Sequence, residues 1–176
     1  MSGFEVRHVE IHVFRRPLSK SAKTPSGIEF LLLRRAAGQP LPGIWQPITG
    51  SLRRGEAAWR GAVREVREET GLTPHRWWAL EHLVAFYEPH TDRLEALPIF
   101  LAEVGPSDLV TRSREHDAHQ FLPPARAGKT VHWQAQRDAM EAIDREVFLH
   151  PSFRPTSKVT HPRDITTLIH STRRKR

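Results

Sequence analysis

One stretch of the sequence decides the fold, and it reads Gly50-Ser-Leu-Arg-Arg-Gly-Glu-Ala-Ala-Trp-Arg-Gly-Ala-Val-Arg-Glu-Val-Arg-Glu-Glu-Thr-Gly-Leu72. Residues 57–70 contain no proline, a single glycine and mostly good helix formers, so they predict a helix of about four turns. Gly71 is expected to end it. The side chains expected to face the core share one arc of this helix: Trp59, Ala62, Val63, Val66 and Thr70.

Three carboxylates occupy a second arc next to the apolar one. Glu65, Glu68 and Glu69 stand at i, i+3 and i+4, where like charges repel by a few tenths of a kcal/mol per pair. A hard divalent cation such as Mg²⁺ takes oxygen ligands and combines a few carboxylates with water and substrate phosphate. The spacing therefore indicates a cation site, although a solvated charged helix face has the same spacing.

The full pattern around these glutamates is more specific than their spacing. Gly50 is followed after five residues by Glu56, and after seven more by Arg64-Glu65, an aliphatic residue, any residue, Glu68-Glu69, any residue, Gly71 and an aliphatic residue. This pattern resembles, position for position, the signature box of the Nudix hydrolases.

The resemblance implies a fold and a reaction. The fold is an α/β (α+β) sandwich with a mixed sheet between the box helix and a C-terminal helix. The reaction is hydrolysis of a nucleoside diphosphate linked to another group, with water attacking a phosphorus activated by Mg²⁺ or Mn²⁺. The resemblance implies that Glu65, Glu68 and Glu69 hold the metal together with a backbone carbonyl at Thr49 or Gly50.

The resemblance also assigns supporting roles. Glu56 is expected to pair with Arg64 and orient the ligands without binding metal itself. Glu68 or Glu69 is the expected general base. Members of the family commonly supply one further glutamate outside the box as a metal ligand or base, and Glu115 is the candidate here. His116 and His119 are expected to be surface histidines, because nothing supplies a third ligand at a recognisable spacing.

Substrate contacts are expected before the box. Arg34 and Arg35 end a predicted strand, where a guanidinium can bind phosphate in bidentate fashion or simply meet solvent. Trp45 and Gln46 lead into Thr49-Gly50, as in several members of the family that cleave nucleotide or pterin triphosphates. Trp45 can stack on a ring or fill the core, and filling the core is the expectation.

The rest of the chain predicts further strands, one helix and a tail. Residues 9–13 alternate as a half-buried strand, 28–33 form a short apolar strand, and 82–87 and 97–104 favour an antiparallel pair. A helix is expected from Thr130, with that residue as N-cap and a buried face made by Ala139, Met140, Ile143 and Val147. Residues 1–150 are therefore expected to form one domain, and 151–176 a basic tail that is extended or disordered.

Composition narrows the partners. The 176 residues carry a formal charge of +7, which favours anionic partners, both polyphosphates and nucleic acid. The sequence has no cysteine, which excludes disulfide scaffolds and thiolate sites and suits a reducing cytoplasm. No segment is apolar over the roughly 18 residues that a membrane span needs. A soluble, cytoplasmic protein is expected, and both a monomer and a homodimer stay open.

Several functions fit these features. The leading interpretation is a pyrophosphohydrolase acting on a nucleoside triphosphate such as dATP or on dihydroneopterin triphosphate, releasing a monophosphate and pyrophosphate. The enzymatic alternatives are removal of pyrophosphate from the 5′ end of RNA and hydrolysis of a dinucleoside polyphosphate. A non-catalytic Nudix-fold binding or regulatory module belongs to another class, and the complete set of box glutamates argues against it.

Overall fold

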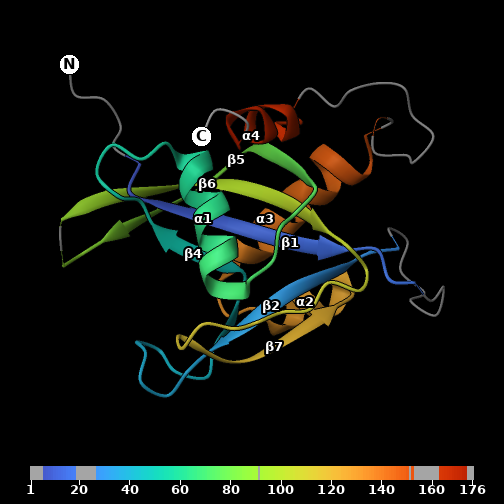
Figure 1. Cartoon of the computed structure of the whole chain (residues 1–176). Helices are drawn as coiled ribbons and strands as arrows, with labels where there is room; N and C mark the ends of the chain where they lie inside the picture. Colours follow the sequence, from blue (N-terminus) through green and yellow to red (C-terminus); the bar gives the residue numbers. More distant parts are fainter. Residues whose placement is uncertain (1–5, 19–26, 91, 151, 153–162, 174–176) are drawn as a thin grey trace.

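Seven strands form one mixed sheet in the computed structural model, which describes residues 6–18, 27–90, 92–150, 152 and 163–173 (Figure 1). Strands β1 and β6 pair in parallel at its centre, and the other strand pairs are antiparallel. The strands are β1 (His8–Arg15), β2 (Glu29–Arg35), β3 (Trp45–Gln46), β4 (Ile48–Ser51), β5 (Arg76–Glu88), β6 (Arg93–Val104) and β7 (His116–Leu122).

The sheet opens where β1 and β2 separate. These strands pair only at Phe14 with Phe30 and at Arg15 with Glu29. Beyond that point β4 lies beside β1, while β3 pairs with β2. Because β4 leads directly into the loop before α1 (Ala58–Thr70), the opening places the end of β4 against this helix.

The predicted box helix is confirmed as α1. It ends at Gly71, which adopts a left-handed conformation with φ of 69° and donates its N–H to the carbonyl of Arg67 at 2.9 Å. Ala62, Val66 and Thr70 are buried, as the apolar arc predicted. Trp59 and Val63 are partly buried against the same core. The carboxylates therefore lie at the margin of a packed interface.

Helices α2 (Pro124–Thr130), α3 (Gln134–Ile143) and the π-helical segment η1 (Asp144–Phe148) cover the opposite face, which completes the expected sandwich (Figure 1). The predicted buried face is confirmed at Ala139, Met140, Ile143 and Val147. The predicted N-cap is wrong. The Thr130 hydroxyl donates to the carbonyl of Arg126 at 2.8 Å, so this residue closes α2.

The predicted strands 82–87 and 97–104 are confirmed within longer strands, β5 and β6. β5 begins at Arg76, so it includes Trp77 and Trp78, a region to which the sequence pattern gave no clear structure. The two indoles are fully buried on opposite faces of the sheet, one in the core under α1 and one in the core under α3. Successive strand residues point to opposite faces, which is why both can be buried. None of the described helices is long and apolar enough to cross a membrane.

The tail expected to be extended or disordered contains helix α4 (Thr166–Arg173), so the expectation is wrong for residues 163–173. Ile165 and Trp77 share a backbone hydrogen bond of 2.9 Å, and Ile169 is buried in the core under α1. The helix lies against the edge strand β5 and buries an isoleucine there. This packing stabilises a segment whose overall composition did not predict a helix. The other residues of the predicted tail, 151, 153–162 and 174–176, lie outside the described residues, apart from Ser152.

Replacing Ile169 by alanine is expected to lower the free energy of unfolding by about 2 to 4 kcal/mol, because a buried isoleucine leaves a cavity. Its side chain is 2% exposed, whereas the neighbouring Leu168 is 46% exposed. Leu168→Ala is therefore the matched control and should cost below about 1 kcal/mol. Urea denaturation of both variants measures the difference, and equal effects would mean that α4 does not contribute to the core.

Candidate functional site

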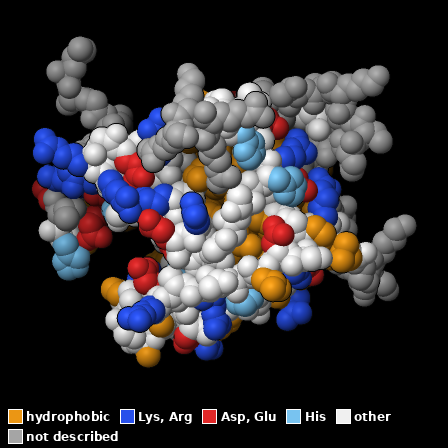
Figure 2. Space-filling view, in the orientation of Figure 1, with side chains coloured by type: hydrophobic (Ala, Val, Ile, Leu, Met, Phe, Trp, Pro, Cys, Tyr) orange, Lys and Arg blue, Asp and Glu red, His pale blue; other side chains and the backbone are white. Residues whose placement is uncertain are grey.

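Glu65, Glu68 and Glu69 lie along one side of α1 and form what we call the carboxylate row. Glu65 and Glu69 are buried, with 9% and 5% of their surface exposed, while the Glu68 side chain is 50% exposed. On this face of the molecule acidic and basic side chains lie next to one another (Figure 2). The row thus runs from solvent into the protein, with two carboxylates largely removed from water.

Arg64 holds two of the row's carboxylates and Glu56. Its guanidinium forms a bidentate pair with Glu56, with N···O distances of 2.8 and 3.0 Å. One Nη also donates to Glu65 at 2.7 Å and to Glu68 at 2.9 Å, and the other donates to the carbonyl of Ser51 at 2.9 Å. The hydrogen bonds from Arg64 lower the pKa of Glu56 to about 2. The same partners raise the pKa of Arg64, so this pair is ionised at any physiological pH.

Glu69 is the most deeply placed member of the row. Burial raises the pKa of its carboxyl group to about 9, and the negative charges of Glu65 and Glu115 add to the effect. Its Oε2 atom has no hydrogen-bond partner among the described residues, and the nearest cationic candidate, His116 Nδ1, is 3.6 Å away and also unpartnered. Burial likewise raises the pKa of Glu65, although Arg64 opposes the shift. Both carboxyl groups therefore lie where an added positive charge would be strongly stabilising.

Gly50, at the end of β4, lies directly against the Glu65 side chain. A β-carbon at this position would overlap with the Glu65 Cγ, Cδ and Oε1 atoms. Only glycine lets the backbone of β4 approach the carboxylate so closely. Backbone and carboxylate oxygens can thus act together at this point.

Replacing Gly50 by alanine is expected to push Glu65 out of the row and to lower catalytic turnover at least about 10-fold, because metal-site geometry tolerates little displacement. Gly38→Ala is the matched control, since a β-carbon at Gly38 would meet nothing within 4 Å. Steady-state kinetics and thermal unfolding of both variants test this. Unchanged turnover in Gly50→Ala would show that the close approach is unimportant.

The loop before β7 brings Glu115 to the row. Glu115 is exposed, and its negative charge raises the pKa of both Glu65 and Glu69. The expectation that His116 is a surface residue is wrong: it is 6% exposed and lies beside Glu69. Burial lowers its pKa, which favours the neutral ring. His119 is exposed, as expected.

The four predicted substrate residues divide between the two faces of the sheet. Strand alternation puts Leu33 and Arg35 towards α1 and Arg34 towards α3. The positive charge of Arg35 acts on Glu69 and His116, so this arginine lies near the row. Arg34 is on the other side, where its Nε donates to Asp117 at 2.7 Å.

Trp45 and Gln46 follow the same alternation. Trp45 pairs with Arg34, lies 5.7 Å from its guanidinium and packs on the core under α3, in line with the expectation of a core residue. Gln46 pairs with Leu33 on the face towards α1 and donates to the Thr49 hydroxyl at 3.3 Å. Of these four residues, Arg35 and Gln46 are therefore on the side of the sheet that carries the row.

Sequence reasoning missed three participants. The sequence predicts His116 to be a surface histidine, whereas its contact with Glu69 depends on the pairing of β7 with β2. Arg53 donates its backbone N–H to Glu56 and its guanidinium to Glu68, at 2.9 and 3.0 Å. The carbonyl of Ser51 fixes Arg64. No spacing in the sequence signals these contacts, because turns and strand pairing create them.

The residues present fit a hard divalent cation. The donors are all oxygen atoms, one buried carboxylate oxygen lacks a partner, and a glycine allows the backbone to approach. As the described side chains stand, no three acidic or histidine groups are gathered closely enough to hold an ion, and Arg64 lies between Glu65 and Glu68. A cation bound at the row would take over contacts that Arg64 and Arg53 now make.

Comparison with known proteins agrees with this geometry. A family model described as NUDIX domain matches residues 21–143. The chain is 35% identical over 96 residues to an asymmetrical bis(5′-nucleosyl)-tetraphosphatase of Caenorhabditis elegans, covering 53% of this chain and 67% of that protein. The enzyme of the same name from Sus scrofa is 33% identical over 117 residues, covering 62% of this chain and 74% of the relative. Nudix hydrolase 6 of Arabidopsis thaliana is 34% identical over 85 residues, 46% of this chain, but the match spans only 29% of that longer protein.

Solved structures share the fold at low sequence identity. A Listeria monocytogenes protein assigned to the NUDIX hydrolases has a TM-score of 0.66 at 18% identity, covering 81% of this chain and 94% of that one. The Caenorhabditis elegans Ap4A hydrolase has a TM-score of 0.63 at 22% identity, covering 80% and 96%. The Escherichia coli dihydroneopterin triphosphate pyrophosphohydrolase has a TM-score of 0.54 at 23% identity, covering 80% and 99%.

Proposed function

The chain belongs to the Nudix family, and from this premise we propose that it is a metal-dependent hydrolase that cleaves a phosphoric anhydride bond in a nucleoside polyphosphate. The observation that carries the proposal is the carboxylate row, in which Glu69 is buried, has an unpartnered oxygen and has a pKa raised to about 9. Burying such a group is costly, and a bound cation would offset the cost. Glu56 and Arg64 complete the arrangement expected from the box.

Glu65, Glu68 and Glu69 would hold one or more Mg²⁺ or Mn²⁺ ions, with the backbone at Gly50 and the carboxylate of Glu115 at the margin. Bound there, such an ion polarises phosphoryl oxygens and lowers the pKa of a water molecule. Glu68 or Glu69 would take the proton from the attacking water.

The neighbouring residues act through position and charge. Arg64 pairs with Glu56 and also contacts Glu65 and Glu68, so we propose that the pair orients these carboxylates. Arg35 adds a positive charge near Glu69, and its guanidinium suits a substrate phosphate. We propose Arg35 and Gln46 as substrate contacts near the row; Arg34 and Trp45 lie on the other side of the sheet and are not proposed as contacts.

A dinucleoside tetraphosphate is the substrate that we place first. Support comes from the two relatives at 33% and 35% identity, whose names specify asymmetrical cleavage of such a molecule. A nucleoside triphosphate such as dATP and dihydroneopterin triphosphate remain the second candidates, because the segment that leads into the box, with Trp45 and Gln46, resembles that of family members that cleave such triphosphates. Removal of pyrophosphate from RNA is a third candidate, because the formal charge of +7 favours binding to the phosphates of a nucleic acid.

Product analysis distinguishes the candidates. The full chain is incubated with Mg²⁺ or Mn²⁺ and either bis(5′-adenosyl) tetraphosphate, dATP, dihydroneopterin triphosphate or a 5′-triphosphorylated RNA. Asymmetrical cleavage of the first yields a nucleoside triphosphate and a monophosphate, whereas cleavage of the others releases pyrophosphate or phosphate. Failure to hydrolyse any of them with either metal would overturn the proposed class and favour a binding module.

A further inference from the structure

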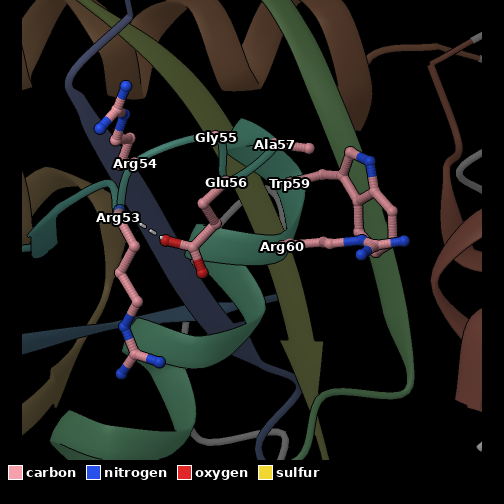
Figure 3. A pocket seen from close by; sticks show the side chains of 7 residues that line it. All are labelled: Arg53, Arg54, Gly55, Glu56, Ala57, Trp59 and Arg60. Atoms are coloured by element: carbon pink, nitrogen blue, oxygen red, sulfur yellow. Dashed lines mark hydrogen bonds between the residues drawn. The ribbon is translucent and has the colours of Figure 1, made fainter.

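An open cavity of about 460 Å³ lies at the start of α1, and the function proposed above gives it no role. We call it the arginine cavity. Its volume lies in the usual range for small-molecule sites. Figure 3 shows the residues that line it, which are Arg53, Arg54, Gly55, Glu56, Ala57, Trp59 and Arg60.

The lining is strongly cationic. It contains three guanidinium groups and one carboxylate, that of Glu56. Both oxygens of Glu56 are already occupied, by Arg64 and by the backbone N–H of Arg53. The carboxylate therefore offers little repulsion, and the cavity favours an anion with several charged oxygens.

One side of the cavity also offers a flat surface. The Arg60 guanidinium lies over the Trp59 indole, 5.1 Å from the ring centroid, and both extend away from Arg53 and Arg54 (Figure 3). Trp59 is partly buried against the core under α1, which holds the ring in place. Nucleobases stack on both aromatic rings and guanidinium planes.

The cavity is connected to the row by one side chain. Arg53 donates to Glu68 at 3.0 Å, although its own side chain is 68% exposed. A polyphosphate that leaves the row at Glu68 would therefore meet Arg53, which also lines the cavity.

We propose that the arginine cavity is the subsite for the distal half of a dinucleoside polyphosphate, in which Arg53 and Arg54 bind phosphate oxygens and the Arg60–Trp59 pair stacks on the second base. This inference rests on the proposed function and adds a specificity site to it. A nucleoside triphosphate has no second nucleoside, so it cannot use the stacking surface.

The test measures KM for bis(5′-adenosyl) tetraphosphate and for ATP in the full chain and in the double variant Arg54→Ala, Arg60→Ala. Both arginines are exposed, so the variant should fold. KM for the tetraphosphate should rise about 10-fold, and at least about fivefold more than KM for ATP. The lysine double variant keeps the charge but loses the planar surface, and should recover only part of the affinity. Arg145→Ala removes an exposed arginine of η1 as the matched control and should change neither KM.

An equal rise of both KM values, or none, would overturn the subsite, because either result shows no selectivity for the second nucleoside. If the lysine double variant recovered the full affinity for the tetraphosphate, the proposed stacking of the second base would be overturned. Equilibrium dialysis of bis(5′-adenosyl) tetraphosphate in EDTA separates the two proposals. If the wild-type chain hydrolyses nothing, yet its binding weakens about 10-fold in the alanine variant, the subsite stands and the hydrolase proposal fails. Selective loss of binding to a short RNA, with the tetraphosphate unaffected, would overturn the subsite.

Discussion

Replacing Glu68 by glutamine is expected to lower kcat by roughly 10² to 10⁴-fold, because the change removes a ligand charge or the general base while keeping the shape. The fold should be unaffected. The Glu68 side chain is 50% exposed, and glutamine retains one oxygen that can accept from either Arg53 or Arg64, which donate to different oxygens of the carboxylate. Steady-state kinetics on the best substrate of the panel, with thermal unfolding in parallel, measures both effects.

Glu141→Gln is the matched control for this experiment. Glu141 is an exposed glutamate on α3, which lies on the face of the sheet opposite α1. The control should change neither turnover nor the melting temperature. If Glu68→Gln turned over the true substrate at the wild-type rate, Glu68 would be neither base nor essential ligand.

Replacing Glu69 by glutamine is expected to have opposite effects on turnover and on metal-free stability. Turnover should fall by roughly 10²-fold or more, as for the other carboxylates. The metal-free protein should become more stable at neutral and alkaline pH, because an amide can be buried without the cost of an ionisable carboxyl group. The unpartnered Oε2 of Glu69 and its 5% exposure are the reason to expect this gain.

The raised pKa of Glu69 explains why the metal-free variant should be the more stable protein at neutral and alkaline pH. Burial raises the Glu69 pKa to about 9 in the folded state, from 4.5. The folded state therefore keeps a proton that the unfolded state releases, so metal-free stability falls as pH rises between these two values. Glu69→Gln has no ionisable group at this position, so it lacks this pH-dependent loss of stability. Its free energy of unfolding should exceed that of the wild-type protein by a margin that grows from pH 5 to pH 9 and reaches about 1 to 3 kcal/mol.

Urea denaturation in EDTA at pH 5, 7 and 9 tests the stability effect, with Glu141→Gln again as control. Adding Mg²⁺ should stabilise the wild-type protein and should stabilise Glu69→Gln much less, because the cation relieves the buried charge only where there is one. Binding should release a proton from the wild-type carboxyl group. A Glu69→Gln variant that is less stable at every pH would show that Glu69 has a favourable partner in the folded protein.

The sequence by itself determined the box helix and the positions on it of the glutamates that we propose as metal ligands. The 3.6-residue period puts Ala62, Val66 and Thr70 on the core face and the glutamates on the next arc, and Gly71 ends the helix through its left-handed conformation. These relations are local, so spacing along the chain is sufficient. The fold class followed from the family resemblance that the same box carries.

Tertiary structure decided what spacing cannot express. The separation of β1 from β2 brings Gly50 against Glu65, and the pairing of β7 with β2 brings His116 to Glu69. Burial makes ionisation of Glu69 unfavourable, and the extent of burial depends on all the elements packed around this side chain. The tail shows the same limit. Its composition predicts an extended or disordered segment. One isoleucine of α4 is nevertheless buried in the core, because α4 lies against the edge strand β5, and composition contains no information about that neighbour.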